Sequence, residues 1–323
     1  MSTTTTDDAR EIQRSPLLDL PGAVAGDGPD APVAAHYGSF NGEQRLLESG
    51  EGFVDLSHHD VVRIAGPDRL TWLHNLTTQH LLHLQPGEET QALILSPQGR
   101  VEHEFRGTDD GEALTVWTEP GAAAALTDFL VRMRFMMVVE ITDVTDRLAL
   151  TWRPANGYRV VPRDELATFA EAAGPPAGLW AFEALRIARG EPRFGVDTDD
   201  KAIPNEVGWV GPAVHLDKGC YRGQETVARV HTLGRPPRRL TMLHLDGSEN
   251  RLPAHGAPVL AGEKQVGWVG SSGRHHELGP IALSLLKRNT PVDAPLMVDG
   301  IAAAQEVLVD PEVGLHVRPD LRG

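Results

Sequence analysis

The sequence predicts an α+β fold with ferredoxin-like α/β units and a small C-terminal β-barrel. Three observations carry this prediction. Residues 60–144 alternate between strand and helix patterns. After residue 238 the sequence pattern changes to short apolar runs between glycine turns. The chain of 323 residues is also long enough for two or three domains.

The first ferredoxin-like unit is expected between residues 35 and 146. Its expected strands are the turn-bounded apolar runs 61–64, 90–96, 101–105, 114–117 and 137–143. One helix should follow Gly66-Pro67-Asp68, because proline and aspartate suit a helix start, and a second should cover the Ala/Leu-rich residues 121–133. The order β-α-β-β-β-α-β resembles a split βαβ unit with one extra strand.

A central lobe is expected over residues 147–237. Its expected strands and helices are 148–152, 158–161, 164–173, 180–189 and 226–231. Residues 191–218 lack periodicity and are rich in glycine and proline. A long irregular stretch inside a folded protein is often functional, so this segment is a candidate part of the site.

The two ends of the chain differ from the middle. Residues 238–323 show short apolar runs punctuated by glycine, which predicts a small all-β barrel. Residues 1–34 are polar and contain the stretch PGAVAGDGPDAP, which predicts a flexible arm. The chain is therefore expected to divide into an arm (1–34), a first lobe (35–146), a central lobe (147–237) and a barrel (238–323).

Composition excludes several classes of protein. The net charge of −15 argues against extended contact with nucleic-acid backbone, which needs clustered lysine and arginine. One cysteine cannot form an intramolecular disulfide, a thiolate zinc site or an iron–sulfur cluster by itself. No histidine pair has the spacing of a zinc-protease motif, so no metal site is expected. With no signal peptide and no long apolar run, we expect a cytoplasmic, monomeric protein without membrane contact.

The densest candidate for chemistry is the stretch KGCYRGQE at residues 218–225. In an extended chain Lys218 and Cys220 point the same way, and an ammonium beside a thiol favours the reactive thiolate. The alternative is an inert, buried thiol in a glycine-flanked turn. A second candidate is the pair Glu102 and Glu104, which share one face of an expected strand, as acid–base groups or as a solvated strand edge.

KGCYRGQE, followed by TVAR, resembles the signature of the folate-binding YgfZ family. VDLSHHDVVRIAGPDRLTWLHNLTTQ (54–79), EALRIARGEPRFGVD (183–197), IPNEVG (203–208) and the barrel segments GWVGSSG and IALSLLKR extend the resemblance to the glycine-cleavage T-protein superfamily. The resemblance implies three lobes around a central opening that binds tetrahydrofolate or a one-carbon derivative. It further implies support of iron–sulfur enzymes, mainly of the [4Fe–4S] type, with those enzymes or cluster carriers as partners and an indirect effect on tRNA modification.

The resemblance also implies roles for single residues. Cys220 would be a functional thiol, and Glu206, matching the P-x-E segment, would accept hydrogen bonds from the pterin ring. Lys218 or Arg229 would bind the acidic glutamyl tail. Tyr221 and Glu225 complete the expected cofactor-binding set.

The alternative within the same superfamily is an aminomethyltransferase, which transfers a one-carbon unit to tetrahydrofolate. Such enzymes rely on a carboxylate in a G-x-x-x-D-D stretch. The matching stretch here runs from Gly99 to Glu104, with His103-Glu104 in place of the two aspartates. A glutamate keeps the charge but moves the carboxylate by one methylene, which disfavours the transferase. A tRNA-binding module is a third hypothesis, which the acidic charge disfavours.

Overall fold

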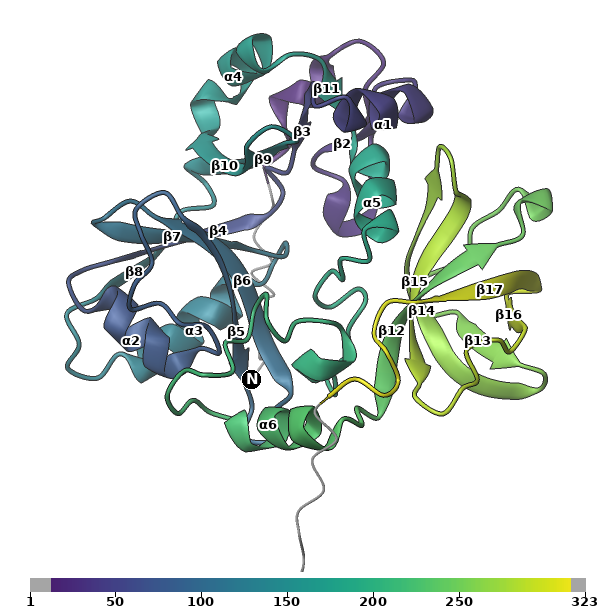
Figure 1. Cartoon of the computed structure of the whole chain (residues 1–323). Coiled ribbons are helices and arrows are strands. Elements are labelled where there is room, and N and C mark those ends of the chain that lie inside the picture. The colour runs from purple at the N-terminus through teal and green to yellow at the C-terminus, as the bar shows by residue number, and fades with distance from the viewer. Residues whose placement is uncertain (1–12, 315–323) are drawn as a thin grey trace, which may run out of the picture.

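The computed structural model describes residues 13–314, which form three lobes around a common centre (Figure 1). The first lobe is a five-stranded antiparallel sheet with the spatial order β5 (Glu89–Leu95), β6 (Val101–Asp109), β7 (Ala113–Thr118), β4 (Asp60–Ala65) and β8 (Glu140–Asp143). Helices α2 (Arg69–Leu76) and α3 (Ala123–Met133) lie on one face of it. The expected ferredoxin-like unit with an extra strand is confirmed.

The second lobe has a four-stranded sheet with the order β10 (Gly157–Pro162), β9 (Leu148–Arg153), β3 (Phe53–Asp55) and β11 (Pro176–Ala177). Its helices are α1 (Phe40–Glu48), the short helix η3 (Arg163–Glu165), α4 (Leu166–Ala173) and α5 (Leu179–Ala188). Because β3 pairs with β9 and β11, residues 40–55 belong to this lobe and not to the first one. The boundary expected at residue 147 therefore does not separate the first two lobes, because segments of the two lobes alternate along the chain.

The third lobe is a closed six-stranded barrel, as the glycine-punctuated runs predict. Around the barrel the strands are β12 (Arg238–Leu245), β15 (Gly279–Lys287), β14 (Lys264–His275), β13 (Pro258–Ala261), β16 (Leu296–Val298) and β17 (Ile301–Val307). β17 pairs with β12, which closes the barrel and leaves no free strand edge. A short helix, η5 (Gly247–Glu249), follows β12.

The N-terminal segment differs from the expected flexible arm. Residues 13–36 fold onto the second lobe as η1 (Pro16–Asp19), β1 (Val24–Ala25), η2 (Gly28–Asp30) and β2 (Ala34–His36). Leu17 is buried beside Phe53, and the Ser15 hydroxyl donates to Asp55 at 2.5 Å. These long-range contacts order a segment whose local sequence is polar. Residues 1–12, the rest of the expected arm, lie outside the described residues.

The irregular stretch expected at 191–218 runs through the centre between the lobes (Figure 1). It contains only the short helix η4 (Pro204–Glu206), and α6 (Gln224–Leu233) follows it under the first lobe and leads into the barrel. A buried cluster joins the stretch to its neighbours, and it contains Trp209 together with Leu93 of β5 and Leu283 of β15. Between residues 13 and 314 we find no helix with the length and hydropathy of a membrane span.

Candidate functional site

Three adjoining cavities occupy the centre of the molecule. The smallest, about 70 Å³, has Glu104 in its wall and is called the Glu104 chamber. The Trp180 cavity, about 400 Å³, shares Glu183 and Arg193 with the chamber. The Trp152 groove, about 540 Å³, shares Arg106, Tyr158 and Glu191 with it. The chamber is therefore the junction between two larger spaces.

Glu104 is the carboxylate of the chamber most suited to proton transfer. It projects from β6, and its side chain is 12% exposed. The Gln91 amide on neighbouring β5 donates to Oε1 at 2.9 Å, while the Arg106 Nε lies 4.0 Å from the same oxygen. Burial raises the pKa of Glu104 to about 7 against these two opposing contacts. A carboxyl group with that pKa can both donate and accept a proton near neutral pH.

Aromatic side chains form part of the chamber walls. Tyr158 packs against Trp117 with ring centroids 5.5 Å apart, and the Arg106 guanidinium lies 5.5 Å from the centre of the Tyr158 ring. Phe182 and Phe194 line the same chamber. Burial raises the pKa of Tyr158 to about 12, so the phenol keeps its proton. Flat ring faces next to converging charges are typical of small-molecule sites.

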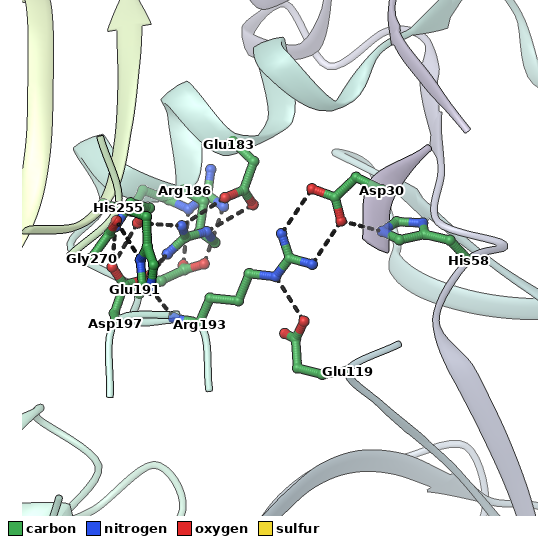
Figure 2. A network of polar contacts seen from close by, with 12 residues as sticks. Asp30, His58, Glu119, Glu183, Arg186, Glu191, Arg193, Asp197, His255 and Gly270 are labelled. Carbon is green, nitrogen blue, oxygen red and sulfur yellow. Dashed lines mark hydrogen bonds and ion pairs between the residues drawn. The ribbon is translucent and has the colours of Figure 1, made fainter. Parts of the chain in front are cut away.

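Arg186 ties the second lobe to the barrel at the edge of the chamber (Figure 2). From α5 its guanidinium contacts Glu183 at 2.7 Å, Asp197 at 3.0 Å and the Ser271 hydroxyl of β14 at 2.7 Å. Its side chain is 7% exposed. Burial alone would raise the pKa of Glu183, but Arg186 brings it below its ordinary value, which keeps Glu183 ionised.

Arg193 crosses from the irregular stretch toward the N-terminal segment, as Figure 2 shows. Its Nε lies 2.7 Å from Glu119, and its two terminal nitrogens lie 2.9 and 3.2 Å from the oxygens of Asp30. Beyond Asp30 lies His58, 3.3 Å away and fully buried. Burial would raise the pKa of Asp30, but His58 and Arg193 hold it well below its ordinary value.

Glu206, the expected pterin carboxylate, lies away from these cavities. It is fully buried in η4, and Arg238 at the start of the barrel donates to both of its oxygens at 2.9 and 2.8 Å. The backbone N–H of Ile203 donates to the second oxygen at 3.2 Å. Glu206 thus joins the irregular stretch to the barrel, and both of its oxygens already accept hydrogen bonds in this conformation.

Lys218 and Cys220 do not form the expected ammonium–thiol pair. Lys218 is buried, and its Nζ donates to the carbonyl oxygens of His74 and Thr77 at the C-terminal end of α2. Burial lowers the pKa of Lys218 to about 8. Cys220 is exposed, so the alternative of a buried thiol is wrong as well. Lys218 is a helix cap that docks the motif onto the first lobe.

The remaining expected residues surround the same loop. Tyr221 is buried below the Lys218 ammonium, which lies 5.2 Å from its ring centre, while Glu225 and Arg229 are exposed on α6. None of these three lines the Glu104 chamber, the Trp180 cavity or the Trp152 groove. Glu102 is ion-paired with Arg222 at 3.1 Å outside the cavities, so it does not pair with Glu104.

The glycines of KGCYRGQE let the loop dock against the β5–β6 hairpin. Gly223 has φ +81°, and a Cβ there would lie 2.5 Å from the Ser96 carbonyl oxygen and 2.9 Å from the Cα of Gly99. A Cβ on Gly99 would lie 2.7 Å from Thr226. The motif therefore supports the hairpin whose second strand, β6, carries Glu104.

We expect Gly223→Ala to destabilise the protein by about 2–4 kcal/mol, because the left-handed φ and the backbone contact both penalise a side chain. Urea unfolding measures the change. Gly219→Ala is the matched control within the same motif, because a Cβ at Gly219 meets nothing within 4 Å. Equal stability of the two variants would contradict the close packing of this loop.

Several residues of the site carry a sequence signal that went unused. Glu183, Arg186 and Glu191 are charges within or just after an otherwise apolar helix, and charge in such a place often marks a paired, buried network. Asp30 gives no such signal, because it lies in a polar, proline- and glycine-rich stretch. Only the folded chain brings Asp30 to Arg193.

Comparisons with known proteins agree with this architecture, although no protein-family model matches the chain. It is 24% identical over 303 residues to a chloroplastic protein of Arabidopsis thaliana described as a candidate transferase, covering 77% of this chain and 69% of the relative. It is 23% identical over 355 residues to an aminomethyltransferase of Nostoc, covering 91% and 93%. The crystal structure of the glycine cleavage system aminomethyltransferase T from Bartonella henselae superimposes with a TM-score of 0.77 at 16% identity, covering 92% and 96%. The chain thus has the T-protein fold and falls in the aminomethyltransferase-like superfamily.

Proposed function

We propose that the protein binds tetrahydrofolate, or a one-carbon derivative of it, in the central cavities and transfers a one-carbon unit with Glu104 as the acid–base group. The observation that carries this proposal is Glu104 itself. It is a nearly buried carboxyl group with a pKa of about 7, set among arginines and aromatic rings at the centre of an aminomethyltransferase-like fold. Perturbed carboxyl groups in such a setting are typical of catalytic sites.

The residues around the cavities fit a folate chemically. A pterin ring offers N–H donors along one edge, which carboxylates such as Glu104 and Glu191 can accept, and flat faces that suit Tyr158 and Phe182. A glutamyl tail needs cations, and Arg274 and Arg189 line the two larger cavities. The chamber alone is too small for a bicyclic ring, whereas the Trp180 cavity and the Trp152 groove are large enough.

Glu104 would carry out the proton transfers. Bound tetrahydrofolate supplies a nitrogen that can accept or release the one-carbon unit. The ionised form of Glu104 can take a proton in the chamber, and its protonated form can return it. Gln91 fixes Oε1 of Glu104, which leaves Oε2 for the reacting group. The surrounding rings limit water around the carboxyl group.

A transfer assay tests this proposal. Purified protein is mixed with tetrahydrofolate and an aminomethyl-lipoyl carrier, and methylene-tetrahydrofolate is measured. We expect turnover above the uncatalysed background, and its absence with protein that binds folate would eliminate the transferase.

The second candidate function is the iron–sulfur role of the YgfZ family, and the exposure of Cys220 favours it. The thiol lies on the surface within the family-like KGCYRGQE loop, where the thiols or clusters of a partner protein can reach it. Because Lys218 is bound to α2, the thiol lacks the expected ammonium neighbour. The support for this function is therefore the exposure of the Cys220 thiol. The partners would be [4Fe–4S] enzymes or cluster carriers, and the folate site would serve the same role.

Gene deletion followed by complementation tests the second candidate. We expect [4Fe–4S] enzyme activities under oxidative stress to fall on deletion and to recover with the wild type but not with Cys220→Ala. Cys220→Ala should leave folate binding unchanged, because Cys220 lines none of the three cavities. Full recovery with Cys220→Ala, or no loss on deletion, would reject this role of the thiol.

A further inference from the structure

The Glu104 chamber is small in this conformation, and the residues that it shares with the Trp180 cavity are Glu183 and Arg193. Its volume of about 70 Å³ holds a few water molecules at roughly 10–15 Å³ each, and no bicyclic ring. Arg193 stands in the wall that the chamber shares with the Trp180 cavity. If the Arg193 side chain swings aside, the chamber joins a space of about 400 Å³.

Ion pairs hold Arg193 in this wall. Glu119, just after β7, accepts a hydrogen bond from the Nε of Arg193, and Asp30 accepts hydrogen bonds from its two terminal nitrogens (Figure 2). The Arg193 side chain is 11% exposed and that of Asp30 is 24% exposed. Charge-assisted, two-point contacts of this kind fix the orientation of a guanidinium group.

Asp30 lies in a segment whose side chains are all at least partly exposed. None of residues 21–32 is buried, although Leu17 before the segment and Val33 after it are. The segment is anchored at its ends and by the pairing of β1 with β2, and the Asp30 side chain is its ionic contact with the centre. Segments with few buried contacts open at low free-energy cost.

The contact between Asp30 and His58 is a poor one. His58 is fully buried, and neither ring nitrogen has a hydrogen-bond partner of good geometry, although Asp30 lies 3.3 Å away. An incompletely satisfied buried polar group favours an alternative arrangement.

We propose that Asp30 and Arg193 form a gate between the Trp180 cavity and the Glu104 chamber, and that a ligand carboxylate in the cavity opens it by taking the place of Asp30 on Arg193. The exchange is one carboxylate for another, so the guanidinium keeps its charge partner. The turn between β1 and β2, which contains η2, loses its ionic contact when Asp30 leaves. This regulation rests on the proposed folate function, whose glutamyl tail supplies such a carboxylate.

Hydrogen exchange of the full-length protein tests the gate without any ligand. We expect Asp30→Asn to increase amide exchange in residues 24–31 by about tenfold, because the segment loses its ionic contact. Asp19→Asn is the matched control, because Asp19 is 74% exposed and pairs only with exposed Arg14. Unchanged exchange in Asp30→Asn would overturn the gate.

A second arm adds ligand to the wild type. We expect 5-formyltetrahydrofolate to increase exchange in the same residues, and a reduced pterin without the glutamyl tail to leave it unchanged. Folate binding without this increase would overturn ligand-driven opening and leave the proposed function intact. Loosening by Asp30→Asn in a protein that binds no folate would reject the proposed function while supporting the gate.

Discussion

Glu104→Gln should reduce one-carbon transfer by about 100- to 10,000-fold, because the amide cannot accept or return a proton. Folate affinity should change by less than about tenfold, since glutamine has the same shape and keeps a hydrogen-bonding group in the chamber. Single-turnover measurements separate the two effects. Glu102→Gln is the matched control from the same strand, because Glu102 lies outside the cavities and pairs with Arg222. Equal activities of the two variants would remove Glu104 from the mechanism.

The same substitution has a pH-dependent effect on stability. The pKa of Glu104 is raised from 4.5 to about 7 by burial, so the folded chain binds this proton more tightly than the unfolded chain. The folded state therefore loses stability as the pH rises from 4.5 to 7, and the loss persists above 7. Glu104→Gln removes this penalty, so the variant should gain roughly 2–3 kcal/mol over the wild type between these pH values. A constant difference between pH 4.5 and pH 7.5 would contradict the raised pKa.

Arg186→Met should destabilise the protein by about 3–5 kcal/mol, because it leaves the buried carboxylate of Asp197 and the partly buried carboxylate of Glu183 without their cation. It also removes the bond to Ser271 that joins α5 to the barrel. Urea unfolding at neutral pH measures the loss. Arg189→Met at the C-cap of the same helix is the control, because Arg189 and its partner Glu191 are 41% and 40% exposed and should contribute less than about 1 kcal/mol. Similar losses for both variants would contradict the buried network.

The regular elements of the fold follow from local sequence. Alternating apolar residues at 90–105 and glycine turns after 238 predict the first sheet and the barrel, because strand faces and turns depend on nearby residues. The interleaving of the lobes could not be predicted in this way. β3 comes directly before the first lobe in sequence, yet it pairs with β9 of the second lobe, almost a hundred residues later. Such pairings depend on long-range packing that no local pattern records.

The site could be predicted only in part. The position of Glu104 after the hairpin turn makes it a candidate from sequence alone. Its pKa, however, depends on burial by residues from several elements. Lys218 and Cys220 are two residues apart in sequence, yet α2 draws the lysine inward while the thiol stays at the surface. Asp30 meets Arg193 across 163 positions of chain. Residue type and spacing indicate candidates, and tertiary contacts decide which of them meet.

Calorimetric titration of the full chain with tetrahydrofolate tests the central claim most directly. The wild type should bind with a stoichiometry of one, and Tyr158→Ala, which removes a ring from both the chamber and the Trp152 groove, should weaken binding at least about tenfold. Phe135→Ala, at an 83% exposed aromatic residue outside the cavities, should bind like the wild type. No binding by the wild type, or equal affinity of the wild type and Tyr158→Ala, would contradict a folate site in the central cavities.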